Sequence, residues 1–133
     1  MAQNKTFSYN IGLTATTTTN IINPGTTTGG VGYGAQNLYF ILTHIRVNNN
    51  AGAAVDVALW LGATGTNLIA NCFAFAGTAT AGALDASTGE SVPANSHLDW
   101  NGRRLMTTAD FLVGGARTAS KLNITIEGEV GVA

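Results

Sequence analysis

Residues 38–47 and 55–61 alternate between apolar and polar types, and a period of two restricts both stretches to strands whose two faces meet different surroundings. In the first stretch the expected buried face consists of Ile41, Ile45 and Val47, and the opposite face of His44 and Arg46. In the second stretch the expected buried face consists of Val55, Val57, Leu59 and Leu61, and the opposite face of Asp56 and Trp60. The joining segment 48–54 is rich in Asn, Gly and Ala, and its Asn and Gly residues tolerate the backbone angles of tight turns. The pattern therefore predicts an antiparallel hairpin at the centre of a β-sandwich.

The rest of the chain favours the same fold class. Residues 6–13 and 121–132 alternate in the same way, and 68–75 and 111–113 are further short strand candidates. No window has apolar residues at helical spacing over three turns. Seven to nine strands with frequent turns predict an all-β protein, an antiparallel β-sandwich or jelly roll, with residues 1–133 as a single domain. The predicted core consists of Ile41, Ile45, Val47, Val55, Val57, Leu59, Leu61, Leu122, Ile124 and Ile126.

Two segments are rich in Thr, Gly and Asn or Ala and predict long loops. Residues 14–36 favour a strand of modest quality followed by a long loop or arm, so that 1–36 includes either an extended N-terminal arm or edge strands of the sandwich. Residues 76–90 predict a second long loop. The Asn101-Gly102 pair between two alternating segments predicts the turn of a further hairpin, because this dipeptide is the strongest short-range hairpin signal.

Composition excludes several classes of partner. Only 10% of the residues are charged, and the net charge is −1, which does not favour nucleic-acid or membrane-surface binding. A chain with so few charges favours burial of part of its surface against other proteins, and we expect a homodimer or homotrimer. One cysteine excludes an internal disulfide, no apolar run approaches the ~20 residues of a membrane span, and the first residues lack a signal-peptide core.

The chain carries few residues suited to catalysis. His44 lies in mid-strand beside Arg46 and is expected to be a surface or cross-strand residue, whereas His97 can pair with Asp99 on the same strand face. No serine or cysteine belongs to a known motif with either histidine, and Cys72 is expected to be a small core residue. The aspartates lack the spacing of a calcium loop. We therefore expect no enzyme activity, no cofactor and no metal site.

Four residues are candidates for a protein interface. Trp60 and Trp100 suit a hot spot or a carbohydrate platform, with packing in the sandwich or on its edge as the alternative. Arg103 and Arg104 follow the predicted Asn101-Gly102 turn, where they either contact a partner or solvate the turn and pair with Asp99.

Several phrases resemble small structural proteins encoded near the capsid genes of tailed bacteriophages. They are LTHIRVNN (42–49), LWLGATG (59–65), VPANS (92–96), the segment from Asp99-Trp100 through 103–113, and EGEVGV (127–132). The resemblance covers residues 38–133 and consists of strand and turn phrases without catalytic content.

Proteins of this kind include capsid decoration, or cement, proteins, and the resemblance implies that role here. It implies a β-sandwich or jelly roll that is made in the host cytoplasm, sits on the outside of the head and joins major capsid subunits. A threonine- and glycine-rich arm suits this task, since an unpaired segment can add a strand to a neighbour's sheet. Two alternatives remain: a receptor- or carbohydrate-binding sandwich of a fibre, and a small self-assembling coat or tail subunit.

Overall fold

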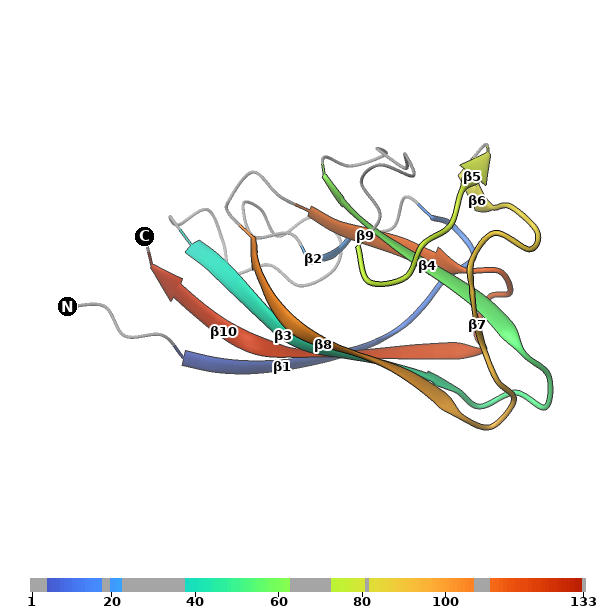
Figure 1. Ribbon diagram of the computed structural model, residues 1–133, viewed down its shortest axis with the longest axis horizontal. Coiled ribbons are helices and arrows are strands. Elements are labelled where there is room, and N and C mark those ends of the chain that lie inside the picture. Colours follow the sequence, from blue (N-terminus) through green and yellow to red (C-terminus); the bar gives the residue numbers. More distant parts are fainter. Residues whose placement is uncertain are drawn as a thin grey trace.

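The computed structural model describes residues 5–17, 20–22, 38–62, 73–80, 82–106 and 111–132, and within these ranges the regular secondary structure is entirely β. No helix long and apolar enough to cross a membrane occurs there. The strands, drawn in Figure 1, are β1 (Lys5–Gly12), β2 (Asn20–Ile22), β3 (Leu38–Asn49), β4 (Val55–Gly62), β5 (Ala79–Thr80), β6 (Ala83–Leu84), β7 (Glu90–Val92), β8 (His97–Met106), β9 (Phe111–Ala116) and β10 (Leu122–Val132).

Eight of these strands form two four-stranded antiparallel sheets that pack face to face. Sheet 1 has the order β1-β10-β3-β8 and sheet 2 has the order β2-β9-β4-β7. Along the chain, every connection between these eight strands crosses from one sheet to the other except the one from β4 to β7. This order is that of a jelly roll, so the predicted fold class is confirmed. The short β5–β6 hairpin lies outside the two sheets (Figure 1).

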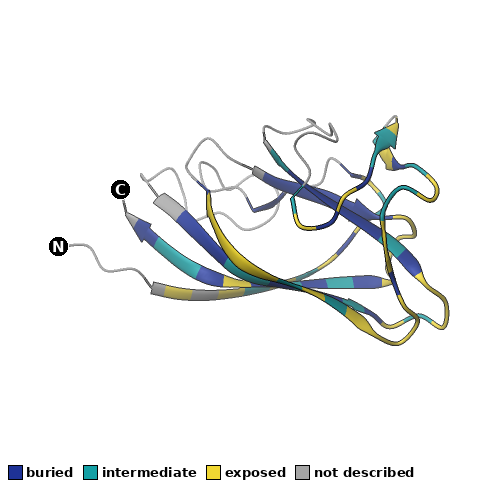
Figure 2. Cartoon of the chain, in the orientation of Figure 1, coloured by how far each residue is buried: buried dark blue, intermediate teal, exposed yellow. Residues whose placement is uncertain are grey.

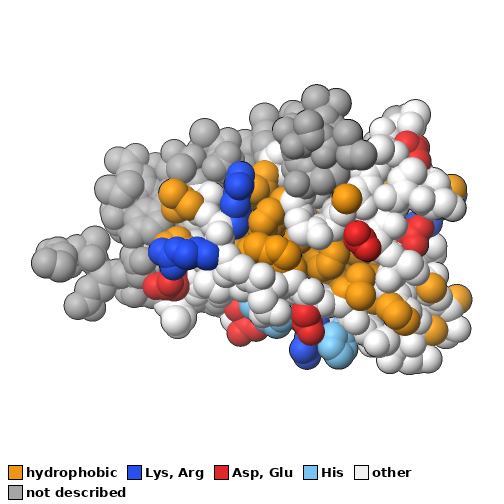
Figure 3. All heavy atoms as spheres, viewed as in Figure 1, with side chains coloured by type: hydrophobic (Ala, Val, Ile, Leu, Met, Phe, Trp, Pro, Cys, Tyr) orange, Lys and Arg blue, Asp and Glu red, His pale blue; other side chains and the backbone are white. Residues whose placement is uncertain are grey.

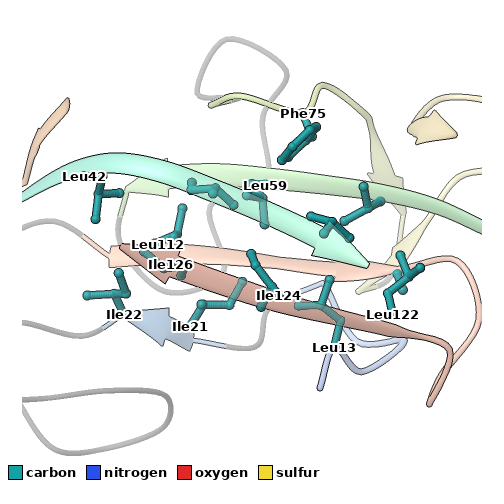
Figure 4. Close-up of a cluster of buried hydrophobic side chains, with 14 of the residues drawn as sticks. Leu13, Ile21, Ile22, Leu42, Leu59, Phe75, Leu112, Leu122, Ile124 and Ile126 are labelled. Carbon is teal, nitrogen blue, oxygen red and sulfur yellow. The ribbon is translucent and has the colours of Figure 1, made fainter. Parts of the chain in front are cut away.

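The core lies between the two sheets and draws on both. Figure 2 shows buried residues along the strands of both sheets, and Figure 4 shows aliphatic side chains from both layers meeting. The predicted residues Ile45, Val47, Val57, Leu59 and Ile126 are completely buried in this cluster. Val55, Leu122 and Ile124 also belong to it, and Leu61 packs against it partly buried. Eight of the ten predicted residues therefore belong to the core cluster.

The residues of β3 that face the core change in the middle of the strand. Phe40 and Leu42 lie in the core cluster, and so do Ile45 and Val47. Strict alternation would place Leu42 and Ile45 on opposite faces. Ile41 is 6% exposed but does not belong to the core cluster. The expectation that it shares a face with Ile45 was therefore wrong.

An irregularity at Thr43 explains the change. Between the pairs Leu42–Gly128 and His44–Glu127, β3 contains one residue that β10 does not match. Such a β-bulge shifts the alternation of the bulged strand by one residue. Gly128 is required here, because a Cβ at this position would lie 2.0 Å from the carbonyl oxygen of Ile41.

The predicted hairpin between residues 38–47 and 55–61 does not form. β3 belongs to sheet 1 and β4 to sheet 2, so the loop between them carries the chain across the sandwich. Asn49 holds this crossing: its side chain donates to the carbonyls of Ala53 (2.9 Å) and Val92 (3.0 Å) and accepts from the amide of Ala51 (2.8 Å). Turn-forming residues suit a crossing as well as a hairpin, and the sequence pattern does not distinguish the two.

The predicted turn at Asn101-Gly102 is also wrong, because both residues lie inside β8. The pairing of β8 with β3 shifts here: His44 lies opposite Asn101 and Leu42 opposite Arg104, so β8 has one extra residue. A Cβ on Gly102 would lie 2.7 Å from the indole ring of Trp100. Glycine therefore makes room for this ring beside a bulge, where the sequence suggested a chain reversal.

The segment around β5 and β6 covers part of the outer face of sheet 2. Trp60, Ala58 and Val113 lie on this face and pack with Leu84 and Ala79 of the hairpin in a second apolar cluster. The segment is held by Asp85, which accepts a hydrogen bond from Thr78 (2.9 Å), and by Arg117, which donates to the carbonyl of Leu84 (2.6 Å). The predicted long loop 76–90 thus contains a short hairpin that closes this face.

Two sequence predictions fall mainly outside the described residues. Of the segment 14–36, the structure describes residues 14–17 and β2, which is an edge strand of sheet 2. The choice between an arm and edge strands for the rest lies outside the described ranges. Of the strand predicted for 68–75, only residues 73–75 are described, and they are not part of a named strand.

Candidate interaction surface

The outer face of sheet 1 carries a group of charged and histidine side chains from three adjacent strands. We call His44, Arg46, His97, Asp99 and Glu127 the ionic cluster. β3 contributes the first two, β8 the next two and β10 the last, and the strand register brings them together. Acidic, basic and histidine side chains gather along the lower edge of the view in Figure 3. Both histidines of the chain belong to this cluster.

His44 bridges the strands on either side of it. Its Nδ1 lies 2.8 Å from a carboxylate oxygen of Glu127, and its Nε2 lies 2.9 Å from a carboxylate oxygen of Asp99. Because an ionised carboxylate only accepts hydrogen bonds, both ring nitrogens donate at once when the imidazole is protonated. The hydrogen bonds to Glu127 and then to Asp99 raise the pKa of His44 above its ordinary value. The side chain therefore acts as a cationic clamp across β10, β3 and β8.

Asp99 is the acceptor that the cluster shares. Arg46 donates to its two oxygens at 2.7 and 3.1 Å, and His97 lies 3.4 Å from one of them. The hydrogen bonds from Arg46 and then His44 hold the pKa of Asp99 far below its usual range. The bidentate contact with Asp99 raises the pKa of Arg46. The charges of the cluster thus neutralise each other within the sheet face.

The cluster is poorly suited to acid–base catalysis. A general base needs a free lone pair, and both nitrogens of His44 point at carboxylates. The described residues contain no group of three or more His, Cys, Asp or Glu side chains that could hold a metal ion. The cluster instead links strands β10, β3 and β8 through their side chains, on a surface where these charges are already paired.

Beyond the ionic cluster, the same face continues to a less polar end. Arg103 is 71% exposed, and its guanidinium lies 4.0 Å from Glu129 of β10. Leu105 of β8 is 56% exposed and pairs with Ile41 across the strands. Arg103 is thus weakly paired and next to an exposed apolar side chain, which suits contact with another protein.

Trp100 and Arg104 lie on the other side of β8, facing the gap between the sheets. The ring of Trp100 meets that of Phe73 edge to face, with the centroids 4.7 Å apart. The guanidinium of Arg104 lies 6.0 Å from the centre of the Phe73 ring. Trp100 and Phe73 are partly buried and pack against the core. Arg103 and Arg104 therefore lie on opposite faces of a strand and not together at a hairpin tip.

Trp60 has a different environment. It is completely buried beneath the β5–β6 segment, and its Nε1 has no hydrogen-bond partner in the described part of the chain. Of the four residues singled out from the sequence, β8 contributes Trp100, Arg103 and Arg104, and Trp60 lies in the other sheet.

A hollow of about 260 Å³ lies at one end of the sandwich. It is lined by Gly12, Asn50, Ala51, Ser120, Lys121, Leu122 and Asn123.

Sequence reasoning found part of this surface. It placed His44 and Arg46 on one strand face and allowed His97 to pair with Asp99. It missed Glu127, which is 83 residues from His44, and the pairing of His44 with Asp99, which is 55 residues away. The sequence shows Glu127 on the polar face of the last strand, in alternation with apolar residues and together with Thr and Asn. Only the sheet order β10-β3-β8 places this glutamate next to His44.

Comparisons with known proteins assign no family. No protein-family model and no curated protein matches the chain. Among solved structures, a protein of Bacillus endospore appendages, described as disulfide-linked pili, is 16% identical, with a TM-score of 0.40 over 100% of this chain and 90% of that one. A pentameric capsid protein from metagenomic phage sequences is 13% identical, with a TM-score of 0.34 over 96% of this chain and 64% of that one. A virus-like particle protein of the prawn Macrobrachium rosenbergii extra small virus is 12% identical, with a TM-score of 0.32 over 99% and 80%.

Proposed function

We propose that this chain is a structural protein of a virus particle, and in finer detail a decoration protein that binds the outside of a phage head and stabilises contacts between major capsid subunits. The observation that carries the proposal is the jelly-roll order of the two sheets, β1-β10-β3-β8 and β2-β9-β4-β7. Jelly rolls of eight strands recur in viral capsid and lectin domains. The resemblance of residues 38–133 to small phage head proteins selects the first of these classes.

The distribution of charge supports a role in protein contact. His44, Arg46, Asp99 and Glu127 pair with one another on the outer face of sheet 1. A partner that covers this face does not have to compensate isolated charges, whose desolvation is costly. Under this proposal the protein has no enzymatic activity and is made in the host cytoplasm. It acts on the capsid surface as part of a homo-oligomer.

The fibre alternative is supported less well. A carbohydrate platform requires an aromatic ring with one open face, and because Trp60 is completely buried, only Trp100, partly buried and in contact with Phe73, is left as a candidate ring. The coat-subunit alternative is favoured by the same jelly-roll order as the main proposal. The two differ in what the protein assembles with: a coat subunit forms shells or tubes by itself, whereas a decoration protein needs a shell made by another protein.

Electron microscopy of the purified protein, alone and mixed with empty shells of the major capsid protein of the same phage, tests the proposal. A decoration protein leaves no particles of its own, adds density to the shells and raises their melting temperature, because it binds the assembled form alone. Unassembled capsid subunits serve as the control and are expected not to bind. Closed particles formed by the protein alone would establish the coat-subunit alternative, and bare shells without particles would refute both.

A further inference from the structure

β8 is the longest free edge on the described part of the molecule. It pairs with β3 along one side from His97 to Met106, and no described strand pairs with its other side. Its five residues 101–105 are all exposed, whichever face of the strand they belong to (Figure 2). An unpaired edge of this length presents a row of free backbone donors and acceptors, which is a template for pairing with another strand.

The side chains of β8 limit which strand can pair there. Arg103 belongs to the outer face and Arg104 to the inner face, and a charged side chain on an edge opposes pairing with an arbitrary strand. A partner strand is accepted only when it supplies a carboxylate opposite Arg103 and leaves Arg104 over the Phe73 ring. β8 itself carries such a carboxylate, Asp99, on the same face as Arg103 and four residues away.

We propose that two copies of this chain pair through β8, antiparallel across a two-fold axis at Asn101. In this register Asp99 of each copy lies opposite Arg103 of the other, so the charge pair forms twice. Centring the axis on Asp99 or on Arg103 places like charges opposite each other, and centring it on Trp100 or Gly102 leaves neither Asp99 nor Arg103 opposite the other. The two copies of sheet 1 then become one continuous eight-stranded sheet.

The surface beside the β8 edge agrees with a second copy. Apolar side chains are exposed in a stripe across the middle of the face shown in Figure 3. Leu98 and Trp100 of β8 and the neighbouring Phe73 are only partly buried against the core. In the register centred on Asn101, Trp100 of the second copy lies opposite Gly102 and its Leu98 opposite Arg104, so the apolar side chains of the two copies lie on one face of the joined sheet.

The other edges lack these features. β2 and β7 comprise three residues each. β1 is longer, but it contains no carboxylate that could pair with its single basic residue, Lys5, so no charge pairing selects a self-pairing register there. Self-association through β8 is a property of the chain alone and does not depend on the proposed role in a virus particle.

Sedimentation velocity over a concentration series tests the pairing. The wild-type protein is expected to show a monomer–dimer equilibrium at neutral pH. Arg103→Glu puts a carboxylate opposite Asp99 twice and is expected to raise the dimer dissociation constant at least about 100-fold. Lys121→Glu makes the same change of charge at an exposed site outside β8, before β10, and is expected to leave dimerisation unchanged. Circular dichroism of each variant checks that the fold is intact.

Cysteine cross-linking tests the register separately. In a Cys72→Ser background, Asn101→Cys places two thiols opposite each other at the axis, within the distance that a disulfide spans, and a covalent dimer is expected on mild oxidation. Leu105→Cys is the control, because its two copies lie eight residues apart along the strands, at about 26 Å, and Leu105 takes no part in the charge pairing. A wild-type protein that is monomeric throughout the series overturns the proposal. So does a dimer that tolerates Arg103→Glu, or one that cross-links through residue 105 as readily as through residue 101.

Discussion

Gly128→Ala is the change whose effect follows most directly from the structure. Gly128 lies in β10 at the bulge of β3, and an added Cβ would be 2.0 Å from the carbonyl oxygen of Ile41 and 3.0 Å from its carbon. Ordinary contact begins near 3.4 Å, so the methyl group is about 1.4 Å too close. The obstructing atoms belong to the backbone of the central strand pair and cannot rotate away. One of the two strands must therefore shift.

Two opposing effects set the change in the free energy of unfolding: overpacking destabilises the folded state, and alanine reduces the conformational freedom of the unfolded chain. Forcing an extra methyl group into a packed site costs about 1–3 kcal/mol and sometimes more, and a backbone obstruction belongs at the upper end. Replacing glycine by alanine returns about 0.4–1 kcal/mol through the unfolded chain. We expect Gly128→Ala to lower the free energy of unfolding by about 2–3 kcal/mol. Gly114→Ala in sheet 2 should behave alike, since its Cβ would lie 2.3 Å from the carbonyl oxygen of Ala58.

Equilibrium urea unfolding followed by far-ultraviolet circular dichroism measures this loss, at one protein concentration for all variants. Gly12→Ala is the matched control. It lies in a strand of the same sheet with nothing within 4 Å of the added Cβ, so its effect is expected to stay within about 1 kcal/mol of zero. If Gly128→Ala unfolds at the same urea concentration as Gly12→Ala, the bulge is not the constraint that we infer.

Two further predictions concern polar side chains. The folded-state pKa of His44 is raised, so its stabilising effect is complete below the unfolded pKa of about 6.5 and is lost as the pH rises through the folded pKa. The difference in urea midpoint between wild type and His44→Gln should accordingly be larger at about pH 5.5 than at about pH 8.5, and an equal difference would contradict the clamp. Asn49→Ala removes three hydrogen bonds at a side chain only 1% exposed and leaves their backbone partners unsatisfied, at an expected cost of about 2–4 kcal/mol. Asn48→Ala, at the half-buried neighbouring position, should cost less than about 1 kcal/mol.

The sequence predicted the parts of the fold that depend on local periodicity. Val57 and Leu59 of β4, and Ile124 and Ile126 of β10, face the core because strands with one buried face must alternate. The exception on β3 arises from the bulge at Thr43, which depends on the register of two neighbouring strands. A period measured along one strand contains no information about that register.

The connections could be predicted less well, for a related reason. Asn, Gly and Ala between β3 and β4 indicate that the chain turns, but in a jelly roll the turn leads to the opposite sheet. Asn101-Gly102 indicates a break in regular pairing, which is correct, but the break is a bulge with Trp100 packed over the glycine. The ionic cluster was only half predictable, because His44 finds its carboxylates on strands far away in the sequence.

The placement of the two tryptophans gives the protein two separate optical reporters. Trp60 is completely buried in sheet 2 and shielded from solvent, so its fluorescence emission lies at short wavelength. Trp100, half-buried on the edge of sheet 1, is open to quenchers dissolved in water. Because regions of one protein can open with different free energies, the two signals need not change together during denaturation. A variant with phenylalanine in place of Trp100 therefore reports on the β5–β6 segment through Trp60. A variant with phenylalanine in place of Trp60 reports on the β8 edge through Trp100.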